Sequence, residues 1–197
     1  QALVRYLNRF VEVDKTLFDP EVYVYVGGNH PLSSLPKENP HRALVEYCLG
    51  RRDIPRKDLR DDTGQIPVLD VEKRDNPVMH MPLTIVGMLG SAEDAGALVP
   101  FLESANDYVV LGAAKAVIRL GDKSKGVAAL RRLTEKDVSK HLPYITEALH
   151  ALKEINHPEF EQITLGVLAR VQEDRSIQPN WLSSFLLLAS EVKDGVW

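Results

Sequence analysis

An internal repeat in the C-terminal part of the chain constrains its fold more than any other feature of the sequence. At an offset of 31 residues, six apolar or small positions of one segment superimpose on the next segment, and a further offset of 35 carries them onto a third. The three sets are Met79, Pro82, Leu83, Val86, Leu89 and Gly90; Val110, Ala113, Ala114, Val117, Leu120 and Gly121; and Ile145, Ala148, Leu149, Leu152, Ile155 and Asn156. Each set has the spacing of one helix face, and the Gly or Asn at its end tolerates the left-handed backbone that terminates helices. A period of this length is typical of stacked helical repeats, whose neighbours bury each other's apolar faces.

A second apolar segment follows each of these helices after a polar turn. The second segments cover residues 98–102, 127–133 and 160–168. Each unit is therefore predicted to be a helix, a tight turn and another helix. A final helix around 180–192 starts a fourth unit or caps the stack, and two glycines, Gly96 and Gly112, lie within or near the predicted helices.

Residues 1–76 do not share the repeat, and seven of the twelve prolines lie between positions 20 and 77. Apolar spacing predicts a helix over 1–13, and the run VYVYV at 22–26 indicates a short strand or an extended segment. A further helix is predicted to start at Pro40, after Asn39 as its cap, and to end before Gly50. The rest, up to Pro77, is predicted to be a short helical turn near 55–60 followed by extended chain.

The repeated strings also carry a family resemblance. IVGMLG, AKAVIRLGD and EALHALKEINHP, followed respectively by ALVPFL, GVAALRRL and EFEQITLGVL, resemble the short HEAT repeats of phycobilisome lyase-like proteins. The resemblance covers about residues 77–197. It implies an all-α fold, a right-handed α-α superhelix (HEAT-like solenoid), with 1–76 as an irregular N-terminal capping region. Tetratricopeptide repeats have a similar period, but their Trp, Gly, Tyr and Pro spacing is not found.

Charge is distributed unevenly along the repeats. The net charge of -4 includes a middle segment, 107–140, with eight basic and four acidic residues, between acidic segments on both sides. Because solenoids usually bind partners on the concave surface lined by the second helices, this basic band predicts a binding site for a protein partner, possibly an acidic one. The candidate residues are Lys123, Lys125, Arg131, Arg132, Lys136 and Lys140. A solvated helix face is the simpler interpretation of the same band.

Motifs that carry chemistry are scarce in this sequence. It has no nucleophile elbow, no phosphate loop that follows a strand, no dinucleotide fingerprint and no zincin motif. The string from Gly121 to Gly126 is interpreted as a turn between helices, and the six histidines do not fall at equivalent repeat positions. Cys48, the single cysteine, shares a helix face with apolar residues and is predicted to be a buried structural thiol. We therefore predict no catalytic residue, no metal and no cofactor.

These observations favour a non-catalytic scaffold or adaptor that binds a protein partner on the concave solenoid face. Two alternatives stay open: a nucleic-acid binder that uses the basic band at 115–140, as among HEAT-like alkylpurine DNA glycosylases, and a subunit of a bilin lyase-like enzyme. No apolar run is long enough to span a bilayer, so a soluble protein is expected. Because the chain begins with Gln1, we expect that an upstream segment was removed, which leaves both a cytoplasmic and an exported location open.

Overall fold

The computed structural model describes residues 40–53, 60–61 and 64–192. This part of the chain is all-α apart from a short antiparallel pairing of β1 (Arg60–Asp61) with β2 (Gly64–Gln65). The α-helices are α3 (Pro40–Cys48), α4 (His80–Leu89), α5 (Ala95–Leu98), α6 (Asp107–Arg119), α7 (Lys123–Thr134), α8 (Val138–Glu154), α9 (Phe160–Glu173) and α10 (Pro179–Ala189). The 3-10 helices are η3 (Val71–Lys73), η4 (Pro77–Met79), η5 (Ala92–Asp94) and η6 (Val99–Glu103).

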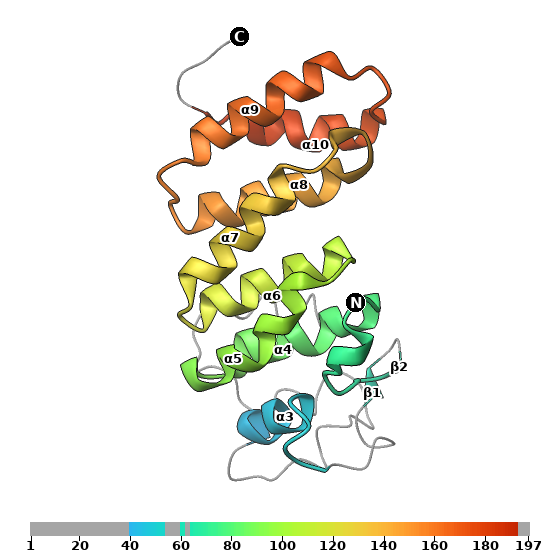
Figure 1. The fold of residues 1–197 in the computed structure, drawn as a ribbon, viewed down its shortest axis with the longest axis vertical. Coiled ribbons are helices and arrows are strands. Elements are labelled where there is room, and N and C mark those ends of the chain that lie inside the picture. Colours follow the sequence, from blue (N-terminus) through green and yellow to red (C-terminus); the bar gives the residue numbers. More distant parts are fainter. Residues whose placement is uncertain (1–39, 54–59, 62–63, 193–197) are drawn as a thin grey trace.

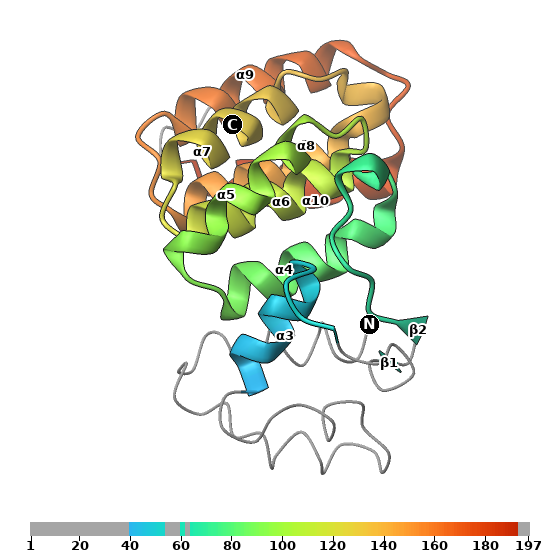
Figure 2. The same cartoon turned by 60° about the horizontal axis from the view of Figure 1, so that its bottom comes forward.

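The helices succeed one another along the long axis of the molecule, from α3 at one end to α9 and α10 at the other (Figure 1). The first helices of the predicted units, α4, α6 and α8, contact each other in sequence order, and α7 packs between α6 and α8. Helix α3 lies beside α4 at one end of the stack (Figure 2). The predicted order of helix, turn and helix is confirmed for α6–α7 and α8–α9, whereas the second helix of the first unit is short and continues as η6.

Polar side chains start the helices in the middle of the stack. Asn106, Asp122 and Asp137 precede α6, α7 and α8, and each side chain accepts a hydrogen bond from a backbone N–H of the first turn. These contacts satisfy donors that the helix itself cannot pair. The turn predicted over Gly121 to Gly126 is shorter in the structure: Gly121 and the cap Asp122 form it, and residues 123–126 already belong to α7.

Two of the three predicted left-handed helix ends are confirmed. Gly121 has φ +107° and Asn156 has φ +52°, which are backbone conformations that favour Gly and Asn. The prediction is wrong at Gly90, which is extended with φ -78° after the last residue of α4. Its N–H still bonds the Val86 carbonyl, and the buried Asp94 carboxylate lies close to it, so the chain turns directly into η5.

Helix α3 confirms the predicted helix from Pro40, and Gly50 follows it with φ +68°. Two predictions, a helix over 1–13 and a strand or extended segment at 22–26, lie outside the described residues. So do residues 55–59 of the helical turn predicted near 55–60, whereas Arg60 lies in β1. The extended chain predicted up to Pro77 is interrupted by η3, which the Asp70 side chain caps.

Glycines allow the first units to approach closely. A Cβ on Gly87 of α4 would lie 2.5 Å from the Cβ of Ala116 and 2.6 Å from its Cα, so the backbones of α4 and α6 are nearly in contact. Similarly, a Cβ on Gly126 would lie 2.4 Å from Ile118 of α6. Hydrogen in place of a methyl group is therefore required at both helix crossings.

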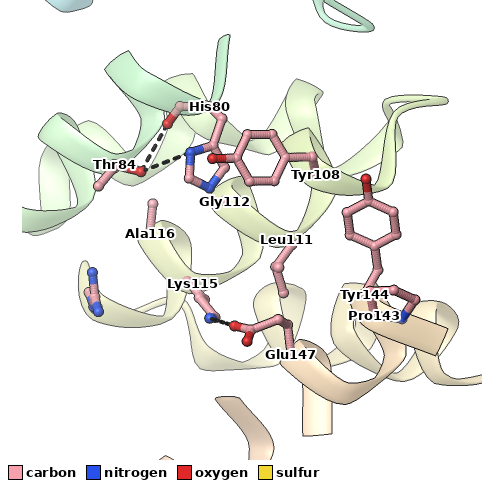
Figure 3. A pocket seen from close by; sticks show the side chains of 11 residues that line it. His80, Thr84, Tyr108, Leu111, Gly112, Lys115, Ala116, Pro143, Tyr144 and Glu147 are labelled. Carbon is pink, nitrogen blue, oxygen red and sulfur yellow. Dashed lines mark hydrogen bonds and ion pairs between the residues drawn. The ribbon is translucent and has the colours of Figure 1, made fainter. Parts of the chain in front are cut away.

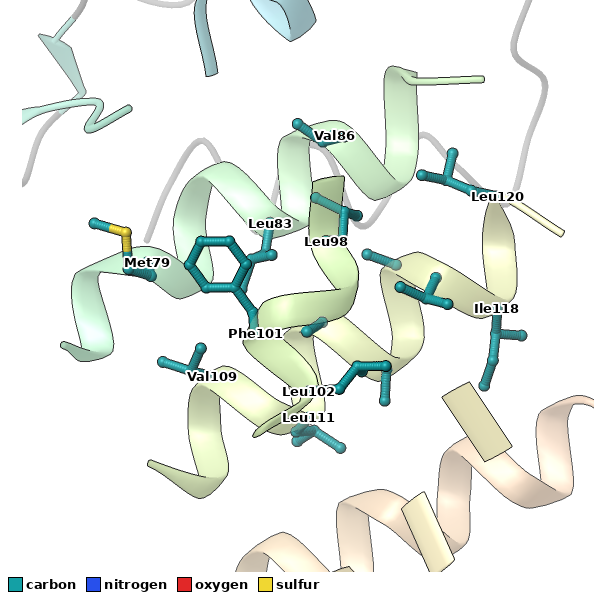
Figure 4. Packing of buried hydrophobic residues seen from close by; sticks show 14 of the residues in the cluster. Met79, Leu83, Val86, Leu98, Phe101, Leu102, Val109, Leu111, Ile118 and Leu120 are labelled. Carbon is teal, nitrogen blue, oxygen red and sulfur yellow. The ribbon is translucent and has the colours of Figure 1, made fainter. Parts of the chain in front are cut away.

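The apolar interior consists of two clusters that meet at α8. The first extends from α3 to α8, with Phe101 buried between α4 and α6 (Figure 4). The second joins α8, α9 and α10 around Phe185. Ala148 and Leu152 of α8 belong to the first cluster, while Ile145 and Leu149 belong to the second. Helix α8 thus contributes buried apolar side chains to both clusters.

Candidate functional site

A pocket of about 340 Å³ lies where the first helices α4, α6 and α8 meet. It is lined by His80, Thr84, Tyr108, Leu111, Gly112, Lys115, Ala116, Arg119, Pro143, Tyr144 and Glu147. Figure 3 shows the Tyr108 ring on one side, the Lys115–Glu147 pair on the other, and Leu111 between them. The pocket therefore combines aromatic, apolar and charged groups from three consecutive units of the stack.

The aromatic side of the pocket is a stacked pair of rings. The imidazole of His80 and the ring of Tyr108 have centroids 3.7 Å apart and planes 9° apart. Gly112 makes room for this arrangement, because a Cβ there would lie 2.6 Å from the Cδ2 of His80. Tyr108 is 41% exposed, so this residue of the lining is accessible from solvent.

His80 is an uncharged base in this environment. Burial, and secondarily the positive charge of Lys115, lowers the pKa of His80 to about 4. Its imidazole is consequently neutral at physiological pH and can stack on Tyr108 without bringing a charge into the helix interface. The Thr84 hydroxyl, which donates to the His80 carbonyl at 2.9 Å, also lies 3.5 Å from its Nδ1.

The opposite side of the pocket is cationic. The ammonium group of Lys115 lies 3.0 Å from the Glu147 carboxylate, which joins α6 to α8. Arg119 lies one helical turn after Lys115 on the same face of α6 and is exposed. It has no carboxylate within ion-pair distance among the described residues. The described lining therefore carries one positive charge in excess.

A buried carboxylate ties the same helices together outside the pocket. Asp107, at the start of α6, is 6% exposed, forms an ion pair with Lys136 and is hydrogen-bonded to His141 of α8. The His141 Nδ1 lies 2.5 Å from the Asp107 Oδ2. Because both partners follow Asp107 by about one repeat period, this contact connects successive units.

The six basic residues predicted to bind a partner lie on α7 and on the turn and first residues of α8 that follow. Five of them have carboxylate partners within the chain: Lys125 with Asp122, Arg131 with Glu159, Arg132 with Glu103, Lys136 with Asp107, and Lys140 with Asp137. Lys123 is exposed and has no such partner among the described residues. Their role in partner binding stays a prediction.

Sequence reasoning missed the pocket. Lys115 and Arg119 belong to the predicted basic band, but the candidate site residues begin at Lys123 on α7 and leave these two out. The spacing of four residues between these two cations was the available signal on α6. No sequence signal could have placed His80 against Tyr108, since the two residues belong to different units.

Other candidate sites have structural roles. Cys48 is fully buried, and burial raises the pKa of its thiol to about 12, which confirms the prediction of a structural thiol. Within the described ranges, no three His, Cys, Asp or Glu side chains are grouped so that they could hold a metal ion. The described helices also include none that is long and apolar enough to cross a bilayer.

Comparison with protein-family models, curated proteins and solved structures finds no significant match to this chain.

Proposed function

We propose that this chain is a HEAT-like α-solenoid, a right-handed α-α superhelix, and that it acts as a non-catalytic scaffold for a protein partner. Helix order along the long axis supports this proposal, as does the sharing of α8 between two apolar clusters. In a solenoid each unit buries its apolar face against its neighbours. Polar contacts between successive units, such as Asp107 with His141 and Lys115 with Glu147, are consistent with the same architecture.

One observation carries the functional part of the proposal: a single pocket draws side chains from α4, α6 and α8. A site assembled from three consecutive units combines groups that no single helix presents, which suits recognition of a segment of a partner protein. Its exposed tyrosine, and an arginine without a carboxylate partner in the described part of the chain, are residue types enriched where proteins bind each other.

Contacts of α3 support the proposed capping role of the N-terminal region. Arg42 and Arg51 each place a guanidinium nitrogen 2.6 Å from the Asp94 carboxylate, which is fully buried. Burial alone would raise the pKa of Asp94, but the Ser91 N–H and the two guanidinium groups outweigh it and lower the pKa to about 2. These two ion pairs connect α3 and the turn after it to the first unit of the stack.

Site-specific photocrosslinking in the source organism tests the scaffold proposal. A photoreactive aromatic residue replaces Glu147 on the first-helix surface in one variant and Arg131 on the second-helix surface in another; both side chains are about half exposed. The proposal expects a stoichiometric protein adduct at one of these surfaces. Absence of a protein adduct at both positions, with the variants folded, would contradict it.

A further inference from the structure

The cations of this protein are not equally available to a partner. On α7, Arg131 and Arg132 approach carboxylates of the chain to 3.0 and 2.8 Å, and Arg132 also donates to the Leu102 carbonyl. These guanidinium groups already have acceptors. Arg119 of α6 has no carboxylate partner among the described residues, although it lines a pocket.

Arg119 is exposed and lines the pocket, so its guanidinium group can bind a carboxylate of another molecule. A guanidinium group presents paired N–H donors that match the two oxygens of a carboxylate. Lys115, one turn away, adds a second cation, and its present partner Glu147 is half exposed at 53%, so the lysine can share its charge with a ligand. Because His80 is neutral, Arg119 and Lys115 are the cations of the lining.

Adjacent to these cations the pocket is apolar and aromatic. Tyr108 presents its exposed ring, and Leu111 and Pro143 line the hollow between α6 and α8. A volume of about 340 Å³ accommodates one side chain of an extended segment together with the carboxylate beside it.

We propose that this pocket binds an internal acidic segment of a partner protein, in which a side-chain carboxylate binds Arg119 and Lys115 and a neighbouring aliphatic or aromatic side chain enters the hollow against Tyr108 and Leu111. This inference rests on the proposed scaffold function and names the chemistry of its ligand. Charge complementarity selects the occupant: one cation of the lining has no carboxylate partner among the described residues, and apolar groups line the same pocket.

The test is selection from a phage-displayed library of random dodecapeptides, followed by binding measurements with the selected peptides acetylated and amidated at their ends. Blocked ends ensure that only side-chain carboxylates contribute. Three proteins are compared: the unchanged chain, Arg119→Glu, and the matched control Arg175→Glu, which makes the same substitution at an exposed arginine outside the pocket. Circular dichroism and thermal unfolding verify that each variant is folded.

The unchanged chain and Arg175→Glu are expected to bind peptides that combine Asp or Glu with an adjacent apolar residue, and Arg119→Glu should bind them at least tenfold more weakly. Equal binding by Arg119→Glu, selected peptides without acidic residues, or no selection at all would overturn the pocket inference. The pocket inference would also be overturned if the free amino acid glutamate bound as tightly as the selected peptides. The scaffold proposal is judged separately, because a crosslinked partner retained by Arg119→Glu removes only the pocket.

Discussion

The interfaces on the two sides of α6 are built differently. Toward α4, glycine at position 87 lets the backbones approach until a Cβ would fall 2.6 Å from the Cα of Ala116. Toward α8, long side chains span the distance, as in the pairs Lys115–Glu147 and Asp107–His141. The first interface is closed by backbone contact, whereas the second is bridged and leaves the pocket between its bridges.

In our proposal, this difference provides the stack with its binding surface. Units joined through small residues leave no room between their helices, while units joined by extended polar side chains leave a hollow with charged edges. Partner binding is therefore expected at the bridged interface, and changes at the closed interface should act on stability. Four predictions test this distinction.

The largest effect is expected for Gly87→Ala, which inserts a methyl group into the closed interface. Because backbone atoms of Ala116 would be displaced, the free energy of unfolding should fall by about 2–3 kcal/mol. Denaturant unfolding measures this change. Gly166→Ala in α9 is the matched control: a Cβ there meets nothing within 4 Å, so the same substitution should stabilise the protein by about 0.5–1 kcal/mol. Equal effects of both substitutions would show that the α4–α6 interface is not closed.

Acid should weaken the closed interface through His80. The pKa of His80 is about 4 when folded and 6.5 without its surroundings, so the unfolded chain takes up the proton first. The contribution of His80 to stability is complete above pH 6.5 and is lost as the pH falls toward 4, by on the order of 2 kcal/mol. The free energy of unfolding of the unchanged chain and of His80→Gln is measured from about pH 7.5 to about pH 4, the range set by these pKa values. The difference between the two curves gives the contribution of His80. Parallel curves would show that His80 does not contribute to the pH dependence of stability.

A smaller loss is expected for Asp107→Asn at the bridged interface. The substitution removes the buried charge that Lys136 and His141 contact, and the free energy of unfolding should fall by about 1–2 kcal/mol. Glu103→Gln is the control, because Glu103 pairs with Arg132 but is 63% exposed and should change stability by less than about 0.5 kcal/mol. If Glu103→Gln destabilised the protein as much as Asp107→Asn, burial would not be the deciding factor.

Glu147→Gln should have the smallest effect on stability. Its ion pair with Lys115 is half exposed, so its loss should cost less than about 0.5 kcal/mol. It frees Lys115 for a ligand, and acidic peptides that bind the pocket should therefore bind about two- to fivefold more tightly at low salt. Fluorescence anisotropy of a labelled acidic peptide measures the change. Weaker binding would indicate that Glu147 itself contacts the ligand.

Much of the helical architecture was predictable because it depends on local pattern. Helix positions followed from apolar spacing. Asn106, Asp122 and Asp137, each of which caps the helix after it, are local signals of helix starts that the prediction did not use. The short second helix of the first unit was predicted less well. Pro100 lacks a backbone N–H, and the chain there continues as 3-10 helix rather than α-helix.

Three properties could be predicted from the sequence alone: the all-α class, the period of the units and the burial of Cys48. Each depends on which residues share a helix face. The pairing of the cations and the position of the pocket depend on tertiary contacts and could not be predicted in this way. Arg132 and Arg119 are the same residue type in the same basic band. Arg132 pairs with Glu103 from another unit, whereas Arg119 contacts no described carboxylate. Such partners lie about one repeat apart in the chain, and only the stacking of the units brings them within the few ångströms over which charges and rings interact.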